Sequence, residues 1–316
     1  MSGGARVEDP EARQYVVTTP DGRRLGVAEY GPPDGVALFN LHGTPGSRYG
    51  GAPPDHPDIY ERLGVRVIQY DRPGYGLSTR HPGRRVADAA ADVAAIADHL
   101  AIDRFAVEGG SGGGPHCLAV AALLPERVTR ASAVVCPAPL GPPGLDRAQW
   151  LAGQTQGNVD EFTRALAGEP TLREHLGPLA AEILVRAETD PGNLFGDTYE
   201  LTDGDRALLA DPRRHERIVR GAQEWLRTGV DGWVDDDLVA VQPWGFDVAD
   251  LRVPVLLWYG LEDTLVPRAH SEWLARSVPG AAVVRMAGGH MDLAHRIEDH
   301  LRWLVGGPLP DDATSG

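Results

Sequence analysis

The sequence contains no lysine; the 30 residues counted as Lys or Arg are all arginine. This absence excludes a Schiff-base lysine, a Ser–Lys dyad and a Walker-type phosphate loop, each of which needs an amine side chain. Cysteine is nearly absent too. Cys117 and Cys136 belong to no C-x-x-C pair and have apolar neighbours, which predicts two buried free thiols and no disulfide framework.

Long apolar runs and a net positive charge are also lacking. No run approaches the roughly 20 residues of a membrane-spanning helix, and the first residues lack the apolar core of a signal peptide. The net charge of −15 disfavours binding to nucleic acid or to an anionic membrane. We therefore expect a cytoplasmic protein with a small-molecule substrate. The sequence leaves its oligomeric state open.

The 316 residues are 42% hydrophobic, enough for a sizeable core. Short β-type runs alternate with helical patterns, which predicts an α/β fold with a mostly parallel sheet and helices on both of its faces. We expect strands at 15–18, 24–30, 36–41, 63–70, 105–107, 128–135, 253–259 and 281–286, and helices at 85–100, 112–124, 268–278 and 292–305.

One block interrupts this alternation. Residues 140–249 contain helical segments divided by Pro and Gly and no convincing strand, so they look like an insertion into the α/β scaffold. The prediction is an α/β core formed by residues 13–139 and 250–306, with a helical insertion between them. Residues 1–12 and 307–316 are expected to be disordered ends.

The glycine-rich stretch Gly109-Gly110-Ser111-Gly112-Gly113 lies between an apolar run and an alanine-rich helical run. This order predicts strand, sharp turn and helix, with Ser111 at the tip of the turn. Nearly side-chain-free neighbours let strand and helix approach each other, and the turn then presents the serine hydroxyl outward beside helix N-terminal amides.

A serine hydroxyl is a weak nucleophile, so it needs a base within reach and a third group to orient that base. Asp263 and His290 each follow the end of a later predicted strand. Because functional groups gather at the carboxyl ends of strands in such sheets, both side chains are expected on the same rim as Ser111. Glu262 is an adjacent competitor for Asp263, and we favour Asp263.

The chain order Ser111, Asp263, His290 with the G-x-S-x-G turn resembles the α/β-hydrolase superfamily. The segments His42-Gly43-Thr44-Pro45-Gly46 and Asp71-Arg72-Pro73-Gly74-Tyr75-Gly76 resemble two further motifs of its capped members. This resemblance implies an α/β-hydrolase fold with an eight-stranded, mostly parallel sheet, and a cap domain at residues 140–249.

The resemblance also implies roles. Ser111 would be the nucleophile, His290 the general base and then acid, and Asp263 the carboxylate that orients it. The backbone amides of Thr44 and Gly112 would form the oxyanion hole, in a loop supported by His42, Gly43, Pro45 and Gly46. No metal site is expected, because no His/Cys/Asp cluster has ligand spacing, and no cofactor is implied.

Several polar residues are expected to be structural. Asp71 and Arg72 are assigned no chemistry, and His116 is interpreted as a packed side chain. Glu108 is either a buried acid near the site or, as we favour, a structural group. The triplet Asp235-Asp236-Asp237 is expected to cap a helix or face solvent. Aromatic and leucine side chains of the helical block would roof the pocket, with two or three facing the substrate: Trp150, Phe162, Trp225, Leu226, Trp233, Trp244 and Phe246.

The leading hypothesis is a serine hydrolase that cleaves a carboxylic ester of a small, fairly apolar molecule through an acyl-enzyme. An aminopeptidase of the proline-iminopeptidase type is the first alternative. Thr44 replaces the usual glycine of that group's loop, and Gly112-Gly113 replaces a bulky residue, which weakens the resemblance. A tailoring or binding protein on the same fold, such as a C–C hydrolase, a cyclase or a ligand receptor, is the second.

Overall fold

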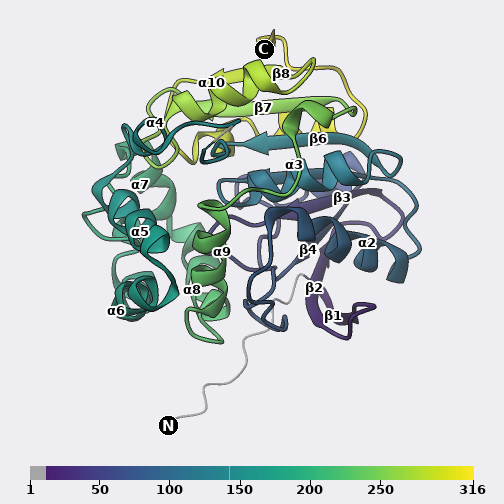
Figure 1. Cartoon of the computed structure of the whole chain (residues 1–316). Helices are drawn as coiled ribbons and strands as arrows, with labels where there is room; N and C mark the ends of the chain where they lie inside the picture. The colour runs from purple at the N-terminus through teal and green to yellow at the C-terminus, as the bar shows by residue number, and fades with distance from the viewer. Residues whose placement is uncertain (1–11, 142) are drawn as a thin grey trace.

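A twisted nine-stranded sheet forms the centre of the computed structural model, which describes residues 12–141 and 143–316. Parallel pairing joins β4, β3, β5, β6, β7 and β8 in that order, whereas β1, β2 and β9 pair antiparallel at the two edges. The mostly parallel sheet flanked by helices is thus confirmed (Figure 1). The strands are β1 (Arg13–Thr18), β2 (Arg24–Tyr30), β3 (Val36–Leu41), β4 (Val65–Tyr70), β5 (Phe105–Gly110), β6 (Val128–Val134), β7 (Val255–Gly260), β8 (Ala282–Met286) and β9 (Thr314–Ser315).

Helices cover both faces of this sheet. One face carries α2 (Ala89–His99), α3 (Gly113–Leu123) and α10 (Arg268–Ser277), and the other carries α1 (Ile59–Leu63) and α11 (Ile297–Leu304). Strands buried on both sides read as continuous apolar runs, and the sequence of β7, VLLWYG, is buried throughout. The sheet therefore gives a rigid platform whose strand ends position loops.

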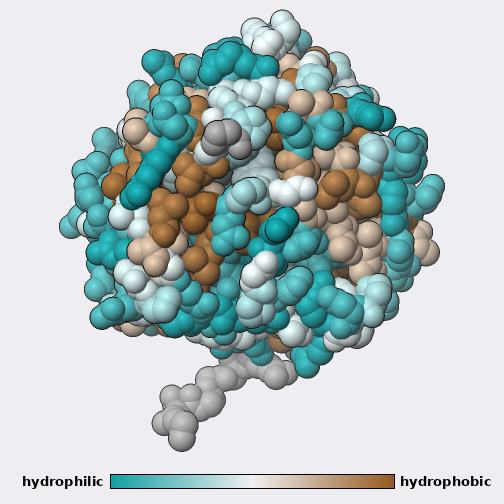
Figure 2. Space-filling view, viewed as in Figure 1, coloured by the Kyte–Doolittle hydropathy of each residue, from teal (hydrophilic) through white to brown (hydrophobic). Residues whose placement is uncertain are grey.

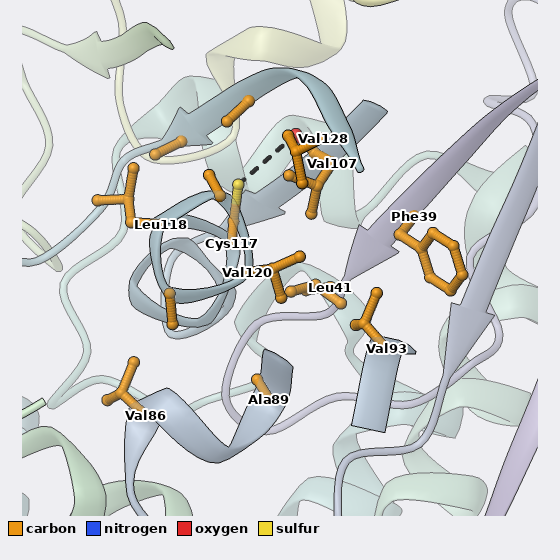
Figure 3. Close-up of a cluster of buried hydrophobic side chains, with 14 of the residues drawn as sticks. Phe39, Leu41, Val86, Ala89, Val93, Val107, Cys117, Leu118, Val120 and Val128 are labelled. Atoms are coloured by element: carbon orange, nitrogen blue, oxygen red, sulfur yellow. Dashed lines mark hydrogen bonds between the residues drawn. The ribbon is translucent and has the colours of Figure 1, made fainter. Parts of the chain in front are cut away.

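Helix α3, which follows Ser111, is held in place by its packing on the sheet. Figure 3 shows Cys117 of α3 turned toward Val107 and Val128 of the strands and Val120 beside Leu41, with α2 next to α3. The Cys117 thiol donates a hydrogen bond to the Val107 carbonyl at 3.6 Å. Both cysteines are buried and unpaired, as predicted.

A separate group of helices lies to the left of the sheet in Figure 1. Over the described part of residues 140–249, helices and short 3₁₀ turns occur and no strand does. This helical region has its own apolar core, to which Leu172, Leu176 and Ile183 contribute from one face of its longest helix. Its helices are α4 (Arg147–Leu151), α5 (Gln156–Ala167), α6 (Glu169–Thr189), α7 (Asp203–Leu209), α8 (His215–Trp225) and α9 (Asp231–Ala240). Within the described residues, no helix is both long and apolar enough to span a membrane.

The C-terminal end differs from the expectation. Residues 307–316 were predicted to be disordered, but Thr314–Ser315 forms β9, which pairs antiparallel with Ala282 and Val283 of β8. The Arg285 guanidinium donates to the Thr314 hydroxyl at 2.8 Å. The outer edge of β8 offers unpaired backbone groups, and the chain end pairs with them, which makes nine strands instead of eight. Of the predicted disordered segment 1–12, residues 1–11 lie outside the described residues.

Candidate active site

Three loops at one edge of the sheet carry the residues predicted to do chemistry. Strands β5, β7 and β8 are parallel, and they end at Gly110, Gly260 and Met286. Ser111, Asp263 and His290 follow these ends by one, three and four residues. The structure therefore brings the loops that carry all three to the same rim of the sheet.

The backbone of the turn at Ser111 is strained. Ser111 adopts φ of 53°, the left-handed region that few non-glycine residues occupy. Its N–H donates to the Val134 carbonyl at 2.9 Å. A Cβ at Gly109 would overlap the Gly113 carbonyl, and one at Gly113 would overlap the Leu41 carbonyl. Glycine at position 109 thus lets β5 and α3 approach each other closely, and glycine at position 113 lets α3 approach the end of β3.

His290 and Asp263 form a pair in which Asp263 is buried and His290 is partly buried. The His290 Nδ1 lies 2.8 Å from Asp263 Oδ2, and Asp263 Oδ1 accepts the backbone N–H groups of Leu265 and Val266 at 2.9 Å each. Burial alone would lower the pKa of His290, but the charge and hydrogen bond of Asp263 raise it above its usual value. Glu262, the competitor for this position, is exposed. The carboxylate that contacts His290 is therefore Asp263.

The loop His42–Gly46 lies directly against the Ser111 turn. A Cβ on Gly112 would lie 2.8 Å from Thr44 Cβ and 3.2 Å from the Thr44 nitrogen, so these two predicted oxyanion residues are neighbours. Arg72 clamps this loop, because its guanidinium donates to the carbonyl oxygens of His42 and Gly43, the latter at 2.9 Å. The Arg72 N–H also donates to His42 Nε2 at 3.1 Å.

The carboxylate of Asp236 neutralises this clamp from the helical region. It accepts hydrogen bonds from Arg72 Nη2 at 2.5 Å, the Thr44 hydroxyl at 2.7 Å and the Tyr75 hydroxyl at 2.9 Å, and it pairs with Arg84. Burial opposes ionisation of Asp236, yet the guanidinium groups of Arg72 and Arg84 hold its pKa well below the usual range. A charged side chain on α9 thus bonds directly to the loop beside Ser111.

The expectation for the acidic triplet was therefore wrong. Asp235, Asp236 and Asp237 neither cap a helix nor face solvent; all three are buried within α9. Asp235 pairs with Arg80 at 2.7 Å. Such burial is stable because arginines supply the opposite charge for two of the three. These arginines come from the sheet region, by which we mean residues 13–139 and 250–306.

A mostly apolar cavity of about 250 Å³ opens beside these loops. Ser111, Thr44, Gly112 and His290 line it on the sheet side. Six aromatic side chains line it as well: Trp150, Phe162, Phe195, Tyr199, Trp233 and Trp244. Four of them were among the predicted candidates, whereas Phe195 and Tyr199 were not. Trp225, Leu226 and Phe246 are absent from this lining. In Figure 2, hydrophobic residues gather left of centre, near the place that α5 occupies in Figure 1.

Two carboxyl groups of the helical region also face the cavity. Glu161 accepts hydrogen bonds from Trp233 Nε1 at 3.0 Å and from the Tyr199 hydroxyl. Burial and the neighbouring Glu161 carboxylate raise the pKa of Asp237 well above its usual range. Two adjacent buried carboxylates repel each other, and a proton on Asp237 relieves this repulsion. Nothing in the local sequence pattern signalled this pair.

The remaining candidates lie apart from the chemistry or beside it. Glu108 accepts from Asn40 Nδ2 at 2.7 Å and lies 2.9 Å from His300 Nε2; it does not line the cavity. His116 is buried yet touches the cavity, and its Nδ1 lies 2.9 Å from the Gly112 carbonyl oxygen. Burial and the charge of Arg72 lower the pKa of His116 to about 3, so its ring is neutral. Among the described residues, no group of His, Cys, Asp and Glu has the arrangement of a metal site.

Comparison with known proteins agrees with this architecture. The family model described as the alpha/beta hydrolase fold matches residues 36–294. The chain belongs to the alpha/beta-hydrolase family. A hydrolase from Pseudomonas aeruginosa superimposes with a TM-score of 0.65 at 21% identity, covering 93% of this chain and 98% of that one. An esterase from Thermogutta terrifontis superimposes with a TM-score of 0.63 at 22% identity, over 93% and 98% of the two chains.

Curated relatives of this alpha/beta hydrolase carry several names. A probable proline iminopeptidase of Leptolyngbya boryana is 36% identical over 100 residues, which cover 31% of this chain and 30% of that protein. The chain thus matches less than a third of that relative's length. A bifunctional esterase/perhydrolase of Acinetobacter calcoaceticus is 32% identical over 261 residues, covering 79% and 83% of the two chains. These relatives indicate a hydrolase without fixing the bond that it cleaves.

Proposed function

We propose that this protein is a serine hydrolase that cleaves a carboxylic ester of a small, fairly apolar molecule through an acyl-enzyme. The observation that carries the proposal is the strained Ser111 turn opening into the same apolar cavity as His290, whose Nδ1 lies 2.8 Å from Asp263 Oδ2. The 32% identity to an esterase/perhydrolase over most of both chains supports it.

In this mechanism, Asp263 holds Nδ1 of His290 and leaves Nε2 free to face Ser111. His290 takes the proton of the Ser111 hydroxyl while its oxygen attacks the ester carbonyl carbon. The tetrahedral intermediate expels the alcohol, which receives that proton from His290. Water then attacks the acyl-serine ester by the same route in reverse, releasing the carboxylic acid and restoring Ser111 and His290.

Backbone N–H groups would stabilise the oxyanion that forms in each step. We assign this role to the amides of Gly112 and Thr44, whose loops lie against each other. His42, Gly43, Pro45 and Gly46 would give the Thr44 loop its shape, and Arg72 and Asp236 would hold it in place. Fixed donors of this kind stabilise the transition state because they need no reorganisation during the reaction.

The helical region, residues 140–249, would act as the cap over a core formed by residues 13–139 and 250–306. Its aromatic side chains line the cavity, so an apolar acyl or alcohol group gains from leaving water there. A cavity of about 250 Å³ favours small substrates. A panel of esters graded in chain length and bulk measures this preference through kcat/KM.

Labelling with a fluorophosphonate followed by intact mass measurement tests the nucleophile. We expect one adduct on the wild-type protein, none on Ser111→Ala and the normal adduct on Ser277→Ala, which removes a serine outside the cavity. Ester hydrolysis by Ser111→Ala should fall by about 10⁴-fold or more, as in other serine hydrolases that lose the nucleophile. An unlabelled wild type, or equal labelling of Ser111→Ala, would contradict the proposal.

An aminopeptidase is the second candidate function. The observation that favours it is the buried pair of Glu161 and Asp237 at the cavity wall, because a carboxylate out of water attracts the protonated amine of a peptide. The partial match to a probable proline iminopeptidase points the same way. Thr44 and Gly112-Gly113 remain departures from that group's pattern.

Proline 4-nitroanilide and 4-nitrophenyl butyrate, assayed side by side, separate the two candidates. The ester should be the better substrate by kcat/KM. If the proline amide is preferred and Glu161→Gln raises its KM without affecting the ester, the aminopeptidase is the correct function. If the proline amide is not cleaved, that candidate is dismissed.

A further inference from the structure

Asp205 is a buried carboxylate of the helical region that touches the His290 loop. It lies in the first turn of α7 and is only 3% exposed. Its Oδ2 accepts the backbone N–H of His290 at 3.1 Å, and its Oδ1 accepts the N–H of Met291 at 2.7 Å. The Thr202 hydroxyl orients it by donating to Oδ2 at 2.8 Å. Both carboxylate oxygens are thus engaged at the segment that carries the proposed base.

The glycine before His290 makes room for this carboxylate. A Cβ on Gly289 would overlap Asp205 Oδ2 and would lie 2.6 Å from Thr202 Oγ1. The side chains of Asp205 and Thr202 therefore reach the loop backbone at a position where the loop carries no side chain of its own. This close approach requires both a glycine in the β8 loop and an acid on a helix more than 80 residues earlier.

We propose that Asp205 is a positioning residue for catalysis, which fixes the backbone of His290 while Asp263 fixes its ring. This inference rests on the proposed function, since it assumes that His290 is the base. A histidine held only through Nδ1 can still swing about its own backbone. With the N–H groups of residues 290 and 291 bound to Asp205, the ring is held at two points.

The negative charge of Asp205 acts on His290 as well. Burial lowers the pKa of His290, whereas Asp263 and then Asp205 raise it by stabilising the imidazolium. Among the other charged groups at the cavity, Asp236 is paired with Arg72 and Arg84. The other ionisable groups that line this cavity are Glu161, Asp237, Tyr199, His116 and His270. Removal of the Asp205 charge should therefore lower the pKa of His290.

The test is Asp205→Asn, which keeps the shape but removes the charge and one acceptor. Loss of a carboxylate that supports a metal-bound imidazole typically lowers activity or affinity by about 10- to 100-fold. By analogy, we expect Asp205→Asn to lower kcat by about that factor. The KM for a neutral ester should change little. The acid limb of the kcat/KM profile should move to lower pH, because a base with a lower pKa is deprotonated at lower pH.

Asp203→Asn is the matched control. Asp203 lies on the same first turn of α7 and is exposed, so its loss removes equal charge without touching the His290 loop. Its kcat and acid limb should stay at the wild-type values. Thr202→Val, which keeps the charge but removes the hydroxyl that orients Asp205, should lower kcat with a smaller pH shift. If Asp205→Asn fails to fold, the kcat and the acid limb of Thr202→Val are compared with those of Asp203→Asn instead.

A readout without substrate separates this inference from the proposed function. Titration of the His290 ring by NMR, assigned with His290→Gln, should give a lower pKa in Asp205→Asn than in the wild type. If the protein cleaves no ester but the ring pKa falls as stated, the contact stands and the proposed function fails. If Asp205→Asn is folded and both kcat and the His290 pKa equal those of the wild type, the role of Asp205 is refuted.

Discussion

The two regions of this molecule contribute to the candidate site in different ways. The sheet region presents Ser111, Asp263 and His290 on loops whose positions follow from parallel strands ending at one edge. The helical region contributes two carboxylates: Asp205 bonds to the His290 loop, and Asp236 bonds to the Thr44 loop beside Ser111. The first set is recognisable from local motifs, whereas the second is defined only by contact.

The two regions also differ in what holds them. The sheet is covered by aliphatic packing, as around Cys117 and Val107, and that packing is insensitive to charge. The contact between α9 and the Thr44 loop depends instead on buried ion pairs between Asp236 and two arginines. Buried pairs have little net effect on stability when intact but cost much when broken, so this contact should fix geometry more than it adds stability.

The largest effect should come from the carboxylate that the sheet region supplies to His290. Asp263→Asn should lower kcat by about 10⁴-fold, because an amide in this position favours the wrong tautomer of the imidazole. The corresponding change at Asp205, about 10- to 100-fold, should be much smaller. Steady-state kinetics on one ester measures both. Equal losses in the two variants would contradict the distinction between orienting the ring and holding the backbone.

The next largest effect should be on stability, at the contact between the regions. Asp236→Ala leaves Arg72 and Arg84 buried with unbalanced charge, so the free energy of unfolding should fall by about 3–5 kcal/mol. Urea unfolding measures this loss. Asp235→Ala, on the same helix, is the control and should lose less, because its partner Arg80 is partly exposed. If Asp236→Ala is as stable as Asp235→Ala, the buried pairs do not hold the contact.

The smallest effect should come from closing the space between α7 and the His290 loop. Gly289→Ala would push against Asp205, which should cost about 1–3 kcal/mol of unfolding free energy and lower kcat. Gly204→Ala, in α7 itself, places its Cβ at an ordinary 3.8 Å from Thr202 Oγ1 and should be neutral or slightly stabilising. Thermal unfolding and ester turnover check both. An unaffected Gly289→Ala would show that the close approach is unnecessary.

Much of the sheet region was predictable because its signals are local. Apolar runs, turn glycines and the strand–turn–helix order around Ser111 predicted the parallel sheet, and Asp263 was preferred to the exposed Glu262. The roles of these residues stay predictions until the labelling and kinetic experiments are done. The short strand at Thr314–Ser315 was missed, because two polar residues carry no strand pattern and pair only where β8 offers a free edge.

The acids of the helical region could not be predicted from sequence. Three consecutive aspartates look like a solvated surface, and the arginines that balance two of them, Arg72, Arg80 and Arg84, lie about 150 residues earlier. Helical periodicity indicates which face of a helix is buried but not which loop that face meets. For the same reason, Glu161 and Asp205 look like ordinary surface acids.

The sequence by itself thus determined the fold, the order of the strand-end loops and the residues that those loops carry. Those features depend on short-range backbone preferences, which a few neighbouring residues specify. Only the tertiary structure decided that Asp205 and Asp236 reach the His290 and Thr44 loops, because long-range packing sets which buried charges meet. Which carboxylate contacts which of these loops is therefore set by the folded chain and not by the local sequence.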